Sequence, residues 1–96
     1  MARVLEIKDK TGKNIYLTDE RYSHIKKHPE MINSLPLIEQ TIKNPSTIRD
    51  FEYDPDIKYY YSYHKYRKSK AKYLRVIVKY LNGEGFIITA YFVVNI

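Results

Sequence analysis

The fold of this chain is decided by residues 73–94, which read YLRVIVKYLNGEGFIITAYFVV. Two runs rich in β-branched and aromatic residues, 73–81 and 86–94, flank the turn-forming residues 82–85, and this arrangement is typical of a β-hairpin. Because successive side chains of a strand point to opposite faces, each run has one apolar face. The residues of these apolar faces are Leu74, Val76, Val78, Tyr80, Phe86, Ile88, Ala90 and Phe92. A single core requires the two apolar faces to pair.

The pairing of these faces predicts the length of the connecting loop. Opposed residues share a face of the sheet, so Tyr80 opposite Phe86 requires a loop of odd length. A two-residue turn at Asn82 and Gly83 would instead bring Ile87 to the apolar face, so we expect the longer loop. The second face then carries three cross-strand pairs: Arg75 with Tyr91, Ile77 with Thr89, and Lys79 with Ile87. A surface with only a structural role does not require this mixture of basic, hydroxyl and apolar side chains.

The earlier part of the chain completes an element order of ββααββββ. Residues 4–7 and 14–17 are short extended segments around a turn. A helix is expected from Thr18, a good N-cap, to His28, and a second helix from Ser34 to Asn44. Alternation at 47–53 and 57–66, around a turn at 54–56, predicts two strands. We therefore expect an α+β fold with two N-terminal helices packed on a four-stranded antiparallel sheet, and a short N-terminal β-hairpin.

Composition limits the classes of protein to which the chain can belong. Its 96 residues fit a single domain, residues 1–96. Seventeen Lys and Arg against eleven Asp and Glu give a net charge of +6, which favours a polyanionic partner. The absence of cysteine excludes disulfides, thiolate zinc sites and cysteine nucleophiles. No apolar run is long enough to span a membrane and the N-terminus lacks the apolar core of a signal peptide, so we expect a cytoplasmic protein.

A basic segment without acidic residues, 58–79, follows an acidic stretch at 50–56. It contains eight Lys and Arg residues, interleaved with tyrosines. This separation of charge is typical of a phosphate-binding surface, on which tyrosine rings can stack with bases. The residues that we expect to bind nucleic acid here are Lys65, Arg67, Lys68, Arg75, Tyr61 and Tyr63. The alternative is that the loop at 67–70 is merely solvated and that half of the tyrosines face the core.

Two histidines at positions i and i+4 share one face of the first predicted helix. These are His24 and His28, and Arg21 precedes them by one turn as a candidate substrate-binding residue. Imidazole accepts and releases protons near neutral pH, so both histidines are candidate catalytic residues. The spacing also suits zinc, but only two ligands are present and no HExxH motif occurs, so we expect no metal and no cofactor. For His28, which precedes Pro29, a structural role at the helix end is an equal alternative.

Three phrases of the sequence resemble small RNases of the BECR class (barnase, EndoU, colicin and RelE-like proteins), most closely its phage-associated branch. They are LTDERYSHI with HPE (17–30), IKNPS (42–46), and LRVIVK with ITAYF (74–92). The resemblance implies helices on a four-stranded antiparallel sheet whose concave face holds the active site of a toxin or effector nuclease. It implies catalytic roles for His24, for Lys79 or Arg75, and for the hydroxyls of Thr89 and Tyr91. The helix histidines and the lack of a basic C-terminal tail differ from the RelE-like pattern and argue against ribosome-dependent cleavage.

The predicted function is that of a metal-independent endoribonuclease. A general base takes the proton of the ribose 2′-OH, which attacks the phosphorus, and a general acid protonates the departing 5′ oxygen. We expect His24 to be the base or the acid, with His28 or Tyr91 as its partner. The catalytic candidates are His24, His28, Lys79, Thr89 and Tyr91, with Lys79 and Arg75 holding the phosphate and Thr89 orienting it.

The expected partners are RNA, such as tRNA or mRNA, and a cognate antitoxin or immunity protein. Two other functions stay open. One is a nucleic-acid-binding module without catalysis, in which the histidines only pack. The other is a basic protein, such as a phage-linked inhibitor, that binds an acidic protein partner. Salt-dependent RNA binding without cleavage would favour the first alternative, and a tight acidic partner in pull-downs would favour the second.

Overall fold

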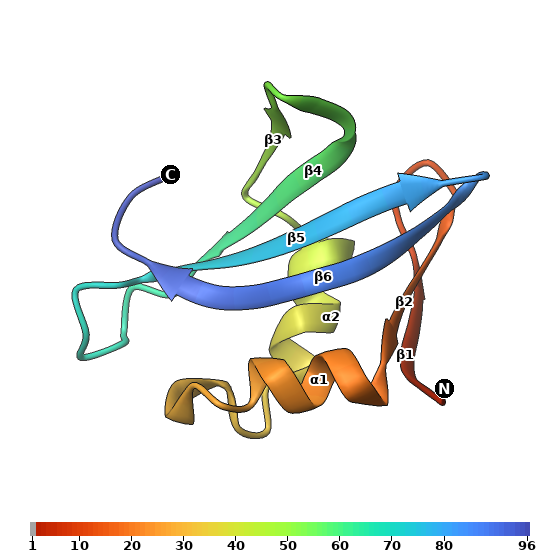
Figure 1. Ribbon diagram of the computed structural model, residues 1–96. Helices are drawn as coiled ribbons and strands as arrows, with labels where there is room; N and C mark the ends of the chain where they lie inside the picture. Colours follow the sequence, from red (N-terminus) through yellow and green to blue (C-terminus); the bar gives the residue numbers. More distant parts are fainter. Residues whose placement is uncertain (1) are drawn as a thin grey trace.

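The computed structural model describes residues 2–96, which form six strands and two α-helices (Figure 1). The strands are β1 (Arg3–Lys8), β2 (Asn14–Thr18), β3 (Thr47–Phe51), β4 (Asp54–Tyr63), β5 (Tyr73–Leu81) and β6 (Glu84–Val93). The helices are α1 (Asp19–Ile25) and α2 (Leu35–Lys43), with a 3-10 turn, Pro29–Met31, between them. The elements follow one another in the predicted order, and the Thr18 hydroxyl caps α1 by accepting a hydrogen bond from the backbone N–H of Arg21. Among residues 2–96, no helix is long and apolar enough to cross a membrane.

The six strands form one mixed sheet in the order β1-β2-β6-β5-β4-β3, so the predicted four-stranded antiparallel sheet is wrong. The N-terminal hairpin belongs to this sheet, because β2 runs parallel to β6 and pairs with it at Ile15 and Gly85. Burial explains this attachment, since Ile7, Ile15 and Leu17 are at most 4% exposed and share the core of the later strands. A Cβ atom at Gly85 would lie only 3.0 Å from the side chain of Ile15, so glycine permits the close approach of β2.

The turn between β5 and β6 also differs from the expectation. It is a two-residue turn at Asn82 and Gly83, flanked by the pair Leu81–Glu84, so the expected odd loop is wrong. Both turn residues have positive φ, 53° and 82°. Asn-Gly is the dipeptide that tolerates this conformation best, and its turn preference prevails over the alternation of the strands.

A β-bulge in β6 resolves the conflict between this turn and the apolar alternation. Ile77 pairs with Thr89, but Val78 pairs with Ile87, which leaves Ile88 as the extra residue. Ile87, rather than Ile88, is therefore buried in the core. The pairs Arg75–Tyr91 and Ile77–Thr89 are as predicted, whereas Lys79 pairs with Phe86 instead of Ile87.

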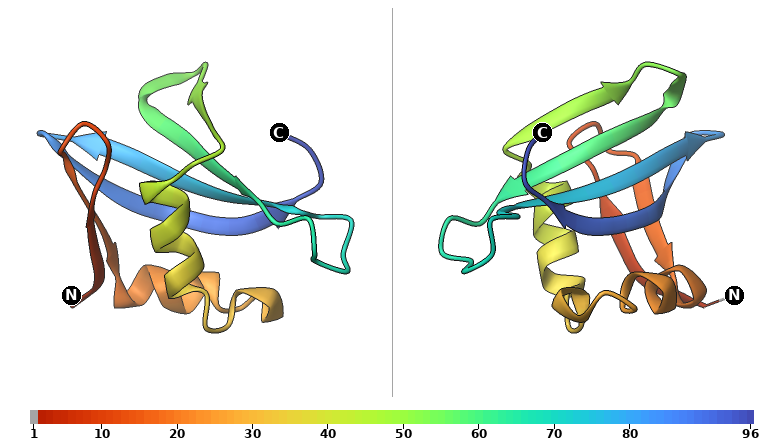
Figure 2. Two further views of the ribbon diagram at one scale, coloured as in Figure 1. Left: turned by 180° about the vertical axis from the view of Figure 1, so that it is seen from behind. Right: turned by 60° about the vertical axis from the view of Figure 1, so that its left-hand side comes forward.

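Both helices lie against one face of the sheet, as the views in Figures 1 and 2 agree. α1 packs mainly on β6 and β2, and α2 on β1, β5 and β4. We call this side the closed face; its core residues include Leu74, Val76, Val78, Ala90 and Phe92, which cluster with Ile25, Ile38 and Ile42 of the helices. We call the opposite side the open face; it carries Tyr59, Tyr61 and Tyr63 of β4, Tyr73, Arg75, Ile77 and Lys79 of β5, and Thr89 and Tyr91 of β6.

Candidate nucleic-acid interface

Arg75 lies at the centre of the open face, on β5 between β4 and β6. Its Nε donates a hydrogen bond to the Tyr61 hydroxyl at 2.9 Å, and its Nη1 donates one to the Tyr91 hydroxyl at 3.1 Å. The guanidinium carbon lies 5.1, 5.4 and 5.6 Å from the ring centres of Tyr59, Tyr61 and Tyr91. Burial opposes the charge, but the hydrogen bonds to Tyr91 and Tyr61 raise the pKa of Arg75 above its ordinary value. The tyrosines therefore hold a charged guanidinium in a fixed position.

Arg75 keeps unused hydrogen-bonding capacity. Arginine has five N–H donors, and only two of those of Arg75 have an acceptor within residues 2–96. No carboxylate of the described chain forms an ion pair with it. The Tyr91 hydroxyl accepts a hydrogen bond from Arg75, so its own proton remains available to a ligand. Together the two side chains suit an anion with several oxygen atoms, such as a phosphate.

Aromatic side chains lie on both sides of Arg75. Tyr63 and Tyr73 form a tilted pair with ring centres 5.0 Å apart, and Phe51 stacks on Tyr59 at 5.7 Å. The Tyr63 side chain is 51% exposed, so its ring is accessible to a base. Tyr61 differs from it, because it is only 1% exposed and positions Arg75 instead of offering a stacking surface.

Lys79 and Thr89 also lie on the open face, in settings that differ from that of Arg75. Lys79 forms an ion pair with Asp54, and its hydrogen bond lowers the pKa of Asp54 below the ordinary value. The predicted turn at 54–56 is shifted to residues 52–53, so Asp54 opens β4 and reaches Lys79. The charge that we expected to hold phosphate is thus already paired. Thr89 is half-buried and lies opposite Ile77, beside the Arg75–Tyr91 pair.

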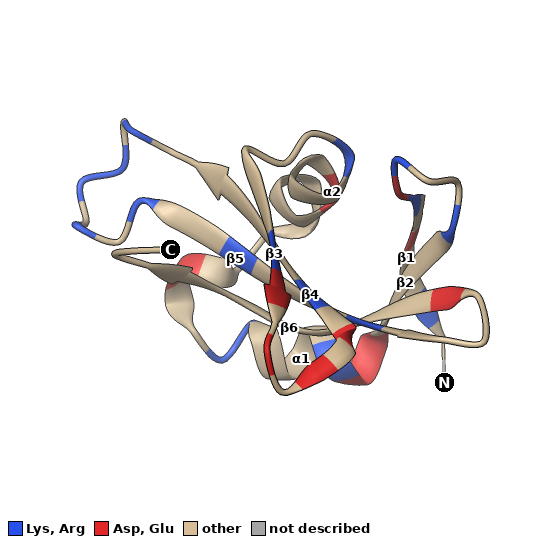
Figure 3. Ribbon diagram, turned by 90° about the horizontal axis from the view of Figure 1, so that it is seen from above, with Lys and Arg blue, Asp and Glu red and all other residues tan. Residues whose placement is uncertain are grey.

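The loop between β4 and β5 carries three more of the predicted nucleic-acid contacts. Lys65 and Lys68 are exposed there. Arg67 is half-buried, because its Nε donates to the Ala71 carbonyl at 3.0 Å and its guanidinium lies 3.5 Å from the ring centre of Phe92. Arg67 therefore helps to hold the loop. Figure 3 shows this basic loop at one end of the sheet and the acidic turn between β3 and β4 at the other, so a polyanion is attracted toward the loop end.

The predicted helix residues lie on the other side of the sheet. His24 is exposed on α1, but the helix ends at Ile25, so its predicted extent to His28 is wrong. His28 is exposed and extended before Pro29, and it shares no helix face with His24. Because α1 packs on the closed face, the histidines do not share a face with Thr89 and Tyr91 (Figure 1). The structure therefore brings Arg75, Thr89 and Tyr91 together but does not bring the helix histidines to them. Arg21, in the first turn of α1, lines a separate pocket of about 250 Å³ with Tyr16, Thr18, Phe86 and Ile87.

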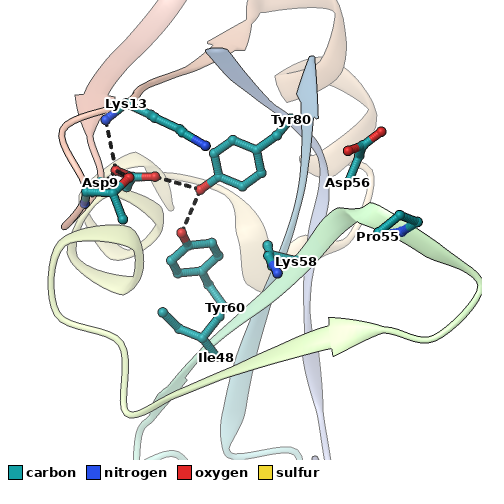
Figure 4. Close-up of a pocket in the computed structure, with 9 residues that line it drawn as sticks. Asp9, Lys13, Ile48, Pro55, Asp56, Lys58, Tyr60 and Tyr80 are labelled. Atoms are coloured by element: carbon teal, nitrogen blue, oxygen red, sulfur yellow. Dashed lines mark hydrogen bonds between the residues drawn. The ribbon is translucent and has the colours of Figure 1, made fainter. Parts of the chain in front are cut away.

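A polar cluster that the sequence did not reveal lies on the closed face, between the N-terminal hairpin and β4 (Figure 4). The carboxylate of Asp9, 8% exposed, accepts hydrogen bonds from Thr11, from the backbone N–H of Lys13 and from the Tyr80 hydroxyl at 2.9 Å. Because Tyr80 gives its proton to Asp9, the Tyr60 hydroxyl donates to Tyr80 across 2.6 Å. Burial would raise the pKa of Asp9, but these hydrogen bonds outweigh it and lower the pKa. The cluster borders a pocket of about 420 Å³ and ties the hairpin to β4 and β5.

Neither a metal-binding group of the described chain nor a known relative indicates the function of this site. Among residues 2–96, no group of three or more His, Asp or Glu side chains is placed to hold a metal ion. In comparisons with known proteins, no family model, no curated protein and no solved structure matches the chain. The geometry of the open face is therefore the feature of the molecule from which a function can be inferred.

Proposed function

We propose that the open face binds single-stranded RNA, with a phosphate at Arg75 and bases on the neighbouring aromatic rings. One observation carries this proposal: two tyrosine hydroxyls hold Arg75, while three of its N–H donors are unused and no carboxylate of the described chain pairs with it. Partial burial of a charge without an ionic partner costs free energy, which a ligand of opposite charge would offset. Phosphate suits the site, because the planar guanidinium binds two of its oxygens at once.

The aromatic neighbours of Arg75 favour RNA in its single-stranded form. Stacking on protein rings requires unpaired bases, which a duplex does not offer. The Tyr63–Tyr73 pair lies on one side of Arg75 and the Tyr59 ring on the other. The exposed lysines of the β4–β5 loop add attraction for the backbone. The resemblance to the BECR RNases supports the same surface and a cytoplasmic target such as tRNA or mRNA.

Metal-independent cleavage of the bound RNA is a second proposed function. The observation that favours it is the hydroxyl proton of Tyr91, which Arg75 does not use. In this proposal the 2′ oxygen attacks the phosphorus and gives its proton to a water molecule, the bond between phosphorus and the 5′ oxygen breaks, and Tyr91 protonates the departing 5′ oxygen. Arg75 stabilises the charge that develops on the phosphorane, and Tyr91 regains its proton from water. His24, on the closed side of the sheet, has no part in this version of the reaction. A toxin or effector role, with an antitoxin or immunity protein, depends on this cleavage.

The first test compares the binding of a single-stranded and a duplex RNA of twelve nucleotides per strand by fluorescence anisotropy. Both carry 2′-O-methyl groups, which remove the nucleophile and separate binding from cleavage. We expect tighter binding of the single strand, with an affinity that falls as salt rises. Arg75→Met should weaken this binding about tenfold or more, because a charge-assisted contact to phosphate is lost. Lys68→Met removes one exposed charge from the loop and should weaken it much less.

Equal affinities for wild type and a folded Arg75→Met variant, or a preference for the duplex, would contradict the binding proposal. Circular dichroism reports whether the variants fold. Cleavage is tested separately with unmodified RNA in EDTA, where wild type should cut the strand. Tyr91→Phe should bind RNA normally but cut it much more slowly, since a positioned general acid contributes roughly 10²–10⁴-fold. Undiminished cleavage by Tyr91→Phe would rule out its role as the acid.

A further inference from the structure

A polar pocket of about 380 Å³ lies at one end of β4, beyond the start of β3. The first residue of β3, Thr47, pairs with Tyr61, so the last residues of β4 have no strand partner on that side. The residues that line the pocket are Leu37, Gln40, Asn44, Ser46, Ser62, Tyr63 and His64. Tyr63 also belongs to the Tyr63–Tyr73 pair of the open face. The pocket therefore lies mostly on the helix side of the sheet, and Tyr63 connects it, around the end of β4, to the surface that we propose for RNA.

Two carboxamide side chains line this pocket without partners in the protein. Gln40 and Asn44 are four residues apart at the C-terminal end of α2, a spacing that places them on one side of the helix. Both residues are exposed, and no hydrogen bond within residues 2–96 uses either carboxamide. A carboxamide offers a hydrogen-bond donor and an acceptor side by side. That pair of groups is suited to the edge of a planar heterocycle.

The third polar group of the pocket is His64, whose tautomer is set by a chain of hydrogen bonds. The Thr41 hydroxyl donates to the Leu37 carbonyl at 2.7 Å. Its oxygen therefore accepts the proton of Ser62, 2.7 Å away, and the Ser62 oxygen accepts from Nε2–H of His64, 2.8 Å away. Burial and, second, the charge of Arg67 lower the pKa of His64, which keeps its ring neutral at pH 7. The Nδ1 atom of this neutral ring is a hydrogen-bond acceptor.

We propose that this pocket binds an adenine base of the RNA strand, an inference that rests on the proposed function. Adenine presents an amino donor beside a ring-nitrogen acceptor, the pattern that Asn and Gln carboxamides match with two hydrogen bonds. The acceptor Nδ1 of His64 suits the second N–H of the same amino group, and the exposed Tyr63 ring supplies a stacking surface. Guanine and uracil carry a keto oxygen at the equivalent position, which would leave His64 facing another acceptor. Cytosine shares the amino group beside a ring nitrogen, but its single ring offers less stacking surface to Tyr63 than the double ring of adenine. The pocket thus selects the base, while Arg75 holds the backbone.

The experiment measures the affinity for 2′-O-methyl oligomers of twelve adenines, twelve cytosines or twelve uracils, and for AMP as a free nucleotide. Wild type should bind the adenine oligomer about tenfold more tightly than the uracil oligomer. Asn44→Asp, which keeps the shape but removes the amide donor, should bring this ratio close to one, as should the uncharged Gln40→Met. Asn14→Asp, an exposed change at the start of β2, is the matched control and should leave the ratio unchanged. Circular dichroism spectra of the three variants are compared with that of wild type, so that only folded variants count.

The outcomes separate the two proposals. Equal affinities for the adenine and uracil oligomers, tighter binding of cytosine or uracil than of adenine, or a ratio that Asn44→Asp and Gln40→Met leave intact would overturn the adenine pocket but not RNA binding. Failure of all the oligomers to bind would overturn the proposed function as well. AMP lacks the neighbouring phosphates that reach Arg75, so it should compete far more weakly than the adenine oligomer. Competition by AMP as strong as that of the oligomer would overturn the assignment of the pocket to a base within RNA.

Discussion

The two faces of β5 are made from alternate residues of one strand, yet they differ in composition and in burial. Leu74, Val76 and Val78 point to the closed face and are 0% exposed, among the apolar side chains of the helices. Arg75 and Ile77 point to the open face and are half-buried, with no helix of the described chain above them. Packing explains every residue of the first set, but it does not explain a guanidinium surrounded by phenols. The face whose composition folding does not require is the one on which function should be sought.

The largest effect that separates the two faces is expected in stability. Leu74→Ala should lower the free energy of unfolding by about 2–5 kcal/mol, because it leaves a cavity among fully buried side chains. Ile77→Ala, on the open face of the same strand, should lower it by about 1 kcal/mol, because Ile77 is only half-buried. Urea denaturation followed by circular dichroism measures both values. Equal decreases in unfolding free energy would show that the open face is packed as closely as the core, and would contradict the difference between the two faces.

A smaller, pH-dependent effect is expected from Asp9 on the closed face. Its pKa is lowered in the folded protein, so the ionised carboxylate stabilises the fold above the unfolded-state pKa near 4, and this contribution is lost as the pH falls through the folded-state pKa. At pH 7, Asp9→Asn should lower the free energy of unfolding by about 1–3 kcal/mol, because hydrogen bonds to a buried charge are weakened.

Acidification provides the control for this prediction. As the pH falls well below 4, Asp9 becomes protonated in wild type, and the difference in unfolding free energy from Asp9→Asn should shrink. Glu30→Gln, which removes an exposed carboxylate, should change the unfolding free energy little at either pH. A difference between Asp9→Asn and wild type that stays constant from pH 7 to acid would mean that the charge of Asp9 does not stabilise the hairpin.

Local patterns in the sequence predicted those parts of the fold that depend on neighbours along the chain. The alternation of β5 and β6 correctly placed Arg75 opposite Tyr91 and Tyr80 on the core side. Thr18 was identified correctly as the cap of α1, because a cap needs only the residues of the first helical turn. The Arg75–Tyr91 pair could therefore be assembled from the sequence of a single hairpin, whereas Tyr61, the second partner of Arg75, comes from β4.

The errors arose where distant segments meet or where two local preferences conflict. Gly85 resembles a turn residue in the sequence, but its lack of a side chain admits Ile15 and makes β2 a parallel neighbour of β6. The Asn-Gly turn and the apolar alternation could not both be satisfied without a bulge, and the sequence does not show where a bulge will form. The ion pair of Lys79 with Asp54 likewise spans 25 residues and has no local signal. His24 and His28 do not share a helix face, because α1 ends at Ile25 and His28 is extended, and their spacing did not reveal which face of the sheet the helix covers.

The smallest effect is expected from His24→Ala, and it tests the comparison of the two faces most directly. The sequence predicts that this change nearly abolishes RNA cleavage, because imidazole is the natural general acid or base. In the fold, however, His24 is exposed on α1, whereas Arg75 and Tyr91 lie on the opposite face of the sheet. Independent sites affect one another little, so we expect RNA affinity and any cleavage to change less than about twofold. The assays are those used for Arg75→Met and Tyr91→Phe. A folded His24→Ala variant with normal binding but no cleavage would mean that His24 takes part in catalysis. The RNA strand would then have to pass around the edge of β6 to reach α1.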